Sequence, residues 1–225
     1  MMKLYNWCLK VLLGVRKSTC NDVCCVESGY PPLQDLVCYR QHKFVHASWR
    51  ERIHQHDDPL HFVLNLVKHS ATSTGRTVTN YVTNDVIPWR VVMSDVVNGV
   101  RNSVTSKRVT YKSINPNLSV HHVYQQRHII NEIHRLSFTK FRVSGHSLAC
   151  ETGRWNKRDR GCLALEDRLC RCGDVQDEQH VTQHCPLTQG IRDNHHFTTM
   201  EQLFSDQFSP GIVCKILHDI LMVFK

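Results

Sequence analysis

The stretch "RLCRCGDVQDEQHVTQHC", Arg168 to Cys185, concentrates cysteine and histidine in a short segment of the chain. Its spacing is C-x-C-x7-H-x4-C. A structural zinc ion takes about four thiolate or imidazole ligands in a tetrahedron, usually two from a tight turn and two from a following helix. We therefore expect one structural zinc ion (Zn2+), bound by Cys170, Cys172, His180 and Cys185.

The residues between these ligands favour a turn followed by a helix. Gly173 follows the first cysteine pair and allows a sharp backbone turn. The sequence "DVQDEQ" then predicts a helix start, with Asp177 or Asp174 as the cap. His180 and Cys185 would lie on that helix, and Pro186 would limit it.

Alternatives to this ligand set remain open. The C-x-C pair is one residue shorter than the usual C-x2-C opening of a zinc knuckle. His184 lies one helical turn from His180 and is a rival ligand, and Cys150 or Cys162 could replace one of the four. The simplest alternative is a set of buried free cysteines beside surface histidines.

The composition indicates a globular protein of one or two small domains, with 225 residues, of which 41% are hydrophobic. A formal net charge of +8 favours a polyanionic partner, most often nucleic acid and sometimes a membrane surface. The 11 cysteines are an odd number, and no convincing signal peptide or membrane span is visible. We expect reduced thiols and a nuclear or cytoplasmic location.

Apolar periodicity predicts a mainly α fold. Helices are expected at residues 4–15, 33–53, from Pro59 onward, after Pro88, and up to Gly145. The last segment, "SPGIVCKILHDILMVFK", predicts an amphipathic helix with one apolar side. We therefore expect an irregular helical region, residues 1–145, followed by residues 146–225 with a basic segment, the small zinc knuckle and the C-terminal helix.

Basic residues flank the cysteine cluster. Their side chains can neutralise phosphates, and an aromatic ring among them can stack on an unpaired base. The expected nucleic-acid-binding residues are Lys140, Arg142, Arg154, Trp155, Lys157, Arg158, Arg160 and Arg171. The alternative is a solvated charged face, with Trp155 packed in the core.

No known catalytic motif is present in the sequence. We find no phosphate-binding Walker loop, no G-x-S-x-G and no H-E-x-x-H. His54, His56 and Asp58 are better explained as the polar start of the helix at Pro59. We expect a protein that is not an enzyme by itself.

Two C-terminal stretches carry a family resemblance. "SFTKFRVSGHSLACETGRW" and "RLCRCGDVQDEQHVTQHCPL" resemble the C-terminal region of reverse transcriptases from non-LTR, LINE-like retrotransposons of the jockey type. The earlier stretches "LLGVRKSTCNDVCCVESGYPPL" and "RQHKFVHASW" look like the segment after the polymerase thumb. The resemblance implies that the zinc knuckle falls on Cys170, Cys172, His180 and Cys185.

The resemblance also implies what this chain lacks. The family's polymerase aspartates, in a Tyr/Phe-x-Asp-Asp turn, have no counterpart, since Asp57 and Asp58 precede a proline. We therefore expect a C-terminal fragment that binds RNA or DNA, and that can contact the upstream polymerase domain. The alternatives are a protein-interaction module that docks through its C-terminal helix, and a decayed element fragment without function.

Overall fold

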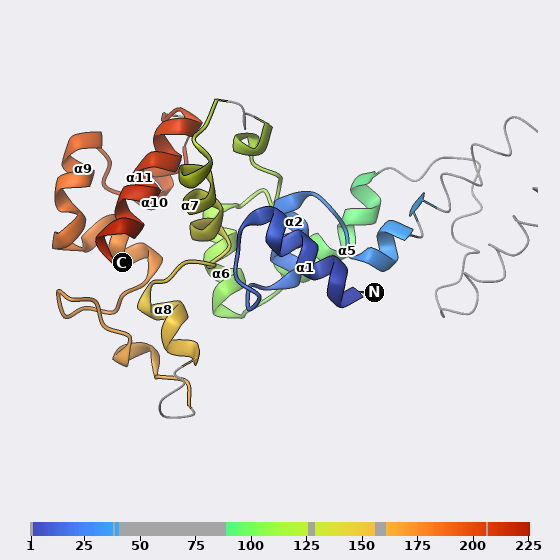
Figure 1. Ribbon diagram of the computed structural model, residues 1–225, viewed down its shortest axis with the longest axis horizontal. Coiled ribbons are helices and arrows are strands. Elements are labelled where there is room, and N and C mark those ends of the chain that lie inside the picture. Colours follow the sequence, from blue (N-terminus) through green and yellow to red (C-terminus); the bar gives the residue numbers. More distant parts are fainter. Residues whose placement is uncertain (1, 38, 41–88, 126–128, 156–160, 206) are drawn as a thin grey trace, which may run out of the picture.

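The described part of the chain is built from helices joined by short turns (Figure 1). The computed structural model describes residues 2–37, 39–40, 89–125, 129–155, 161–205 and 207–225. Within these ranges the only β-type pairing is a single bridge between Leu169 and Val175. The mainly α fold expected from the sequence is therefore confirmed.

The labelled α-helices lie in two groups along the chain. The first comprises α1 (Met2–Leu13), α2 (Asn21–Ser28), α5 (Trp89–Arg101) and α6 (Ser106–Ile114). The second comprises α7 (Glu132–Arg142), α8 (Ala149–Thr152), α9 (Gln189–His195), α10 (Met200–Leu203) and α11 (Pro210–Val223). Short 3-10 turns and one π-helical turn connect them.

Several helix ends agree with the sequence signals. α1 ends just before Gly14, whose φ of +67° is a left-handed conformation that suits glycine. A Cβ atom at Gly14 would also lie 2.2 Å from a side-chain carbon of Leu136, so the two segments approach closely there. α5 begins directly after Pro88. Residues 33–37 and 39–40 are helical, whereas residue 38, residues 41–53 of the expected helix and the helix from Pro59 lie outside the described residues.

The described residues bury two apolar clusters. The first, called here the N-terminal cluster, joins α1, α2, α5 and α6. The second, the C-terminal cluster, is centred on α7 and α11, which lie side by side in Figure 1. Its members run from Ile114 to Leu221, so α7 shares one core with the region after residue 145.

A buried ion pair joins the two groups of helices. Glu27 on α2 is fully buried, and the guanidinium of Arg142 donates to its two carboxylate oxygens over 2.8 and 3.1 Å. The hydroxyls of Tyr111 and Tyr124 donate to the same carboxylate over 2.8 and 2.6 Å. Burial opposes ionisation, but Arg142 and the hydroxyls outweigh it and lower the pKa of Glu27.

This pairing corrects one expectation from the sequence. Arg142 was expected to contact nucleic acid, but it is 1% exposed and bound to Glu27. Its charge balances that of Glu27, because a buried carboxylate needs a cationic partner. A phosphate could reach Arg142 only if the core opened.

The C-terminal helix was considered as a docking surface for another protein. In the structure most of its apolar residues face α7 and the rest of the C-terminal cluster, whereas Ile212 and Met222 are exposed. Six residues of α11 are buried there: Val213, Cys214, Ile216, Leu217, Ile220 and Leu221. This face is part of the chain's own core, so a partner could dock on it only if the core opened.

Within the described residues, no helix combines the length and the apolar character that crossing a membrane requires.

Replacing Glu27 with glutamine should destabilise the protein strongly. The change keeps the shape but leaves the buried Arg142 charge without a carboxylate, at a cost of about 3–5 kcal/mol. Denaturant unfolding followed by circular dichroism measures this. The matched control is Asp22→Asn, which removes the partly exposed ion pair with Arg108 and should cost under about 1 kcal/mol.

The same variant also tests the pH dependence. Because the pKa of Glu27 is lowered in the fold, its contribution is present above the ordinary glutamate pKa of about 4.3 and is lost as the pH falls further. The wild type should therefore lose stability in acid more steeply than Glu27→Gln. Parallel curves for the two proteins would contradict the role given to this pair.

Candidate metal centre

The first two ligands lie on a tight turn. Leu169 and Val175 form the bridge that closes it. Inside, the backbone N–H of Cys170 donates to the carbonyl of Asp174 over 2.7 Å, and the N–H of Gly173 donates to the carbonyl of Cys170 over 3.0 Å. Gly173 has a φ of +103°, which an L side chain rarely adopts. The backbone curvature lets two cysteines separated by one residue face the same point.

The other two ligands lie on the helical turn that follows. Its cap is Asp177, whose carboxylate accepts the backbone N–H of His180 over 2.7 Å. His180–His184 forms a π-helical turn, in which the N–H of Cys185 donates to the carbonyl of His180 over 2.8 Å. Pro186 follows, and Cys185 has the extended backbone that a residue before proline prefers.

The π turn helps to bring His180 and Cys185, which are five residues apart, to the same point. In an α-helix, residues five positions apart are rotated by about 140° from one another, because each residue turns the chain by about 100°. A wider turn, with hydrogen bonds five residues apart, rotates the chain less per residue and so reduces this angle. His180 and Cys185 therefore reach the same point although they are five residues apart.

The four side chains converge closely enough to hold one ion. Their ligand atoms all lie within 4.8 Å of one another. The sulfurs of Cys170 and Cys172 lie 3.7 and 3.9 Å from that of Cys185, and Cys172 Sγ lies 3.1 Å from His180 Nε2. Zinc–sulfur bonds of about 2.3 Å in a tetrahedron place two sulfurs about 3.8 Å apart. The sulfur separations fit such an ion and are too long for a disulfide.

The thiols of this group do not ionise equally. Burial raises the pKa of Cys185 to about 11. Burial acts in the same direction on Cys170, but hydrogen bonds from the Cys172 backbone, from neighbouring thiols and from Gln176 outweigh it, so the pKa of Cys170 is lowered. A metal ion would bind the thiolates, and it would have to displace the proton of Cys185.

Two buried side chains anchor the metal-binding segment. Gln176 accepts the backbone N–H of Ala149 over 2.6 Å, and its amide lies 3.8 Å from the sulfur of Cys170. Arg192 on α9 donates to the carbonyl of Cys185 over 2.8 Å and to the hydroxyl of Thr188. The ligands are therefore attached to the C-terminal core from both sides. Nothing in the spacing of the sequence indicated either residue.

The rival ligands lie elsewhere. His184 is exposed and is not part of the converging group. Cys162 is exposed and accepts a hydrogen bond from Arg168. Cys150 belongs to a second group, with His146 and Glu178. Of the described residues, the four chosen from the sequence are those that the fold brings together at this point.

The basic residues near this group differ in their exposure and in the groups that they contact. Arg171, between the two cysteines of the turn, is exposed and donates to the backbone carbonyl of Val223. Arg154 forms an ion pair with Glu151, and Lys140 is half-buried on α7. For Trp155 only the backbone, in a 3-10 turn, is described. Lys157, Arg158 and Arg160 lie outside the described residues.

Comparison of the chain with protein-family models, with characterised proteins and with solved structures yields no match. The candidate metal-binding group therefore rests on its own geometry. The retrotransposon resemblance seen in the sequence remains an expectation.

Replacing Cys185 with serine should abolish tight zinc binding and lower the melting temperature. The change removes a thiolate that pairs with both other cysteines of the group, and binding energy at a structural zinc site contributes directly to folding. Elemental analysis of the purified protein and thermal unfolding with and without a chelator measure both effects. Cys8→Ser, an exposed thiol on α1, is the control and should keep the metal.

Zinc affinity should fall as the solution is acidified from about pH 8 to about pH 6, since protons compete with the metal for the thiolates and the imidazole. The raised pKa of Cys185 adds to this, because its proton must leave on binding. A competition titration with a zinc-binding dye measures the affinity. An affinity that does not change with pH would exclude a thiolate-rich site.

Proposed function

We propose that this chain is a nucleic-acid-binding segment with one structural zinc knuckle, and that it serves as the C-terminal part of a non-LTR retrotransposon reverse transcriptase. The observation that carries the proposal is the convergence of Cys170, Cys172, His180 and Cys185 within 4.8 Å on a compact turn. The net charge of +8 and the motifs that resemble the family support it.

The role of the metal in this proposal is to hold a small basic surface in shape. Zinc bound at this turn would fix the position of Arg171 between two of its ligands. Arg154 and the basic run at 157–160 lie just before the metal-binding segment in the sequence. Basic side chains on a fixed loop neutralise phosphates and release counterions, which is the main source of affinity in sequence-independent binding. The partner we propose is RNA or single-stranded DNA.

Binding to a single-stranded RNA should weaken steeply as salt rises, and loss of the basic run should reduce that dependence. Each phosphate contact on a single strand contributes about 0.7 to the slope of log affinity against log salt. The combined variant Lys157→Ala, Arg158→Ala and Arg160→Ala should therefore bind more weakly and with a shallower slope. Fluorescence anisotropy over a salt series measures both quantities.

The control for this experiment is Lys215→Ala. Lys215 is an exposed lysine on α11 whose ammonium pairs with Asp219, and its loss should leave RNA binding unchanged. Equal losses in the two variants would indicate non-specific attraction to a basic protein. Binding that ignores salt would exclude the proposed function.

A further inference from the structure

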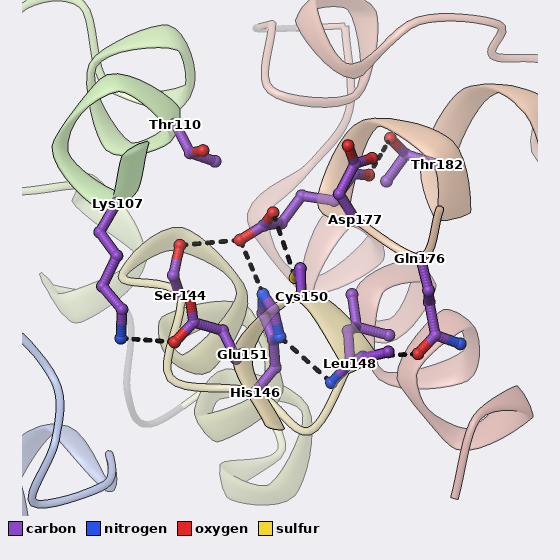
Figure 2. Close-up of polar contacts among 12 residues, drawn as sticks. Lys107, Thr110, Ser144, His146, Leu148, Cys150, Glu151, Gln176, Asp177 and Thr182 are labelled. Atoms are coloured by element: carbon purple, nitrogen blue, oxygen red, sulfur yellow. Dashed lines mark hydrogen bonds and ion pairs between the residues drawn. The ribbon is translucent and has the colours of Figure 1, made fainter. Parts of the chain in front are cut away.

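Next to the metal-binding turn, three side chains of different chemistry meet in the interior. The ligand atoms of His146, Cys150 and Glu178 all lie within 4.8 Å of one another, and all three residues are buried. His146 Nε2 lies 2.9 Å from one oxygen of Glu178, and the sulfur of Cys150 lies 3.7 Å from the other. Figure 2 shows Ser144, His146 and Cys150 directed toward a common point.

The charge of Glu178 distinguishes this group from an ordinary hydrogen-bond network. The described residues include three buried glutamates: Glu27, Glu151 and Glu178. Glu27 pairs with Arg142, and Glu151 pairs with Lys107 and Arg154. The side chains that contact Glu178 are instead a hydroxyl, an imidazole and a thiol. A buried carboxylate is normally paired with a cation or bound to a metal.

We propose that His146, Cys150 and Glu178 form a second metal site, separate from the knuckle, that takes a zinc-type divalent ion. Imidazole nitrogen, thiolate sulfur and carboxylate oxygen are all ligands of zinc. Around a tetrahedral zinc such atoms lie about 3.3–3.8 Å apart. The Cys150–Glu178 separation of 3.7 Å lies in this range, and the His146–Glu178 separation of 2.9 Å would have to widen when the ion replaces the hydrogen bond between them. Three protein ligands leave a fourth position, and the Ser144 hydroxyl lies beside the group, donating to Glu178 over 2.7 Å.

Binding there would exchange some contacts for others. The thiol proton of Cys150 leaves, and the imidazole nitrogen facing Glu178 gives its lone pair to the ion. The other ring nitrogen then carries the proton, so its long contact of 3.4 Å from the Leu148 backbone N–H is given up. In return, the ion places a positive charge next to the Glu178 carboxylate. Without the ion, the carboxylate has a cationic neighbour only if His146 is protonated. All three ligands are buried, which favours a structural role for the ion.

The test is a count of metal ions in the full chain. The reduced protein is loaded with zinc, loosely bound metal is removed by gel filtration, and the stoichiometry is read by native mass spectrometry. The wild type should hold two ions. Cys150→Ala and His146→Gln should each hold one, and the glutamine retains an N–H for Glu178. Cys214→Ala, which removes a buried thiol of the α11 core, should hold two.

Two outcomes would overturn the second site: a wild type that holds one ion, or two ions retained by both Cys150→Ala and His146→Gln. If Cys150→Ala fails to fold, the wild-type count and His146→Gln still decide. The knuckle is judged separately through Cys172→Ser. A single ion that is lost in Cys172→Ser and kept in Cys150→Ala would leave the proposed function standing and remove only the second site.

Discussion

The carboxylate of Glu27 and the guanidinium of Arg142 meet in the interior, and this contact fixes segments that are far apart in the sequence. α2 supplies the acid, the end of α7 supplies the base, and the hydroxyls of Tyr111 and Tyr124 complete the hydrogen bonds. Bringing two charges out of water is costly unless their geometry is good and the remaining lone pairs are used. Here both conditions hold, and an arrangement of the helices that left either charge unpaired would be costly.

The segment that leads to the candidate metal-binding turn begins at the same contact. Arg142 is the last residue of α7, and the chain passes from there through Ser144 and His146 to the short helix α8. Ser144, His146 and Cys150 contact Glu178, and Ala149 contacts Gln176, two and four residues before the ligand His180. Arg192 holds the carbonyl of Cys185 from the other side. The ligands are thus attached to the core on both sides of the turn.

The sequence was sufficient for local features and insufficient for contacts between distant residues. The C-x-C-x7-H-x4-C spacing identified the converging ligands, and Asp177, Gly173 and Pro186 have the expected roles in the cap, the turn and the helix end. The π turn was not foreseeable, because no residue pattern separates it from an α turn. Arg142 was misjudged because its partner, Glu27, is 115 residues away. A basic residue among other basic residues gives no sign that one of them is buried.

The π-helical turn His180–His184, which Cys185 follows, has a consequence for how this segment can change over evolution. The one hydrogen bond that spans the two ligands depends on the number of residues between them and little on their identity. Substitutions at exposed positions such as His184 would leave the path of the backbone intact. Insertion or deletion of a single residue would rotate Cys185 away from the other ligands. The segment can therefore accept substitutions at exposed positions, but it cannot accept an insertion or a deletion between the two ligands.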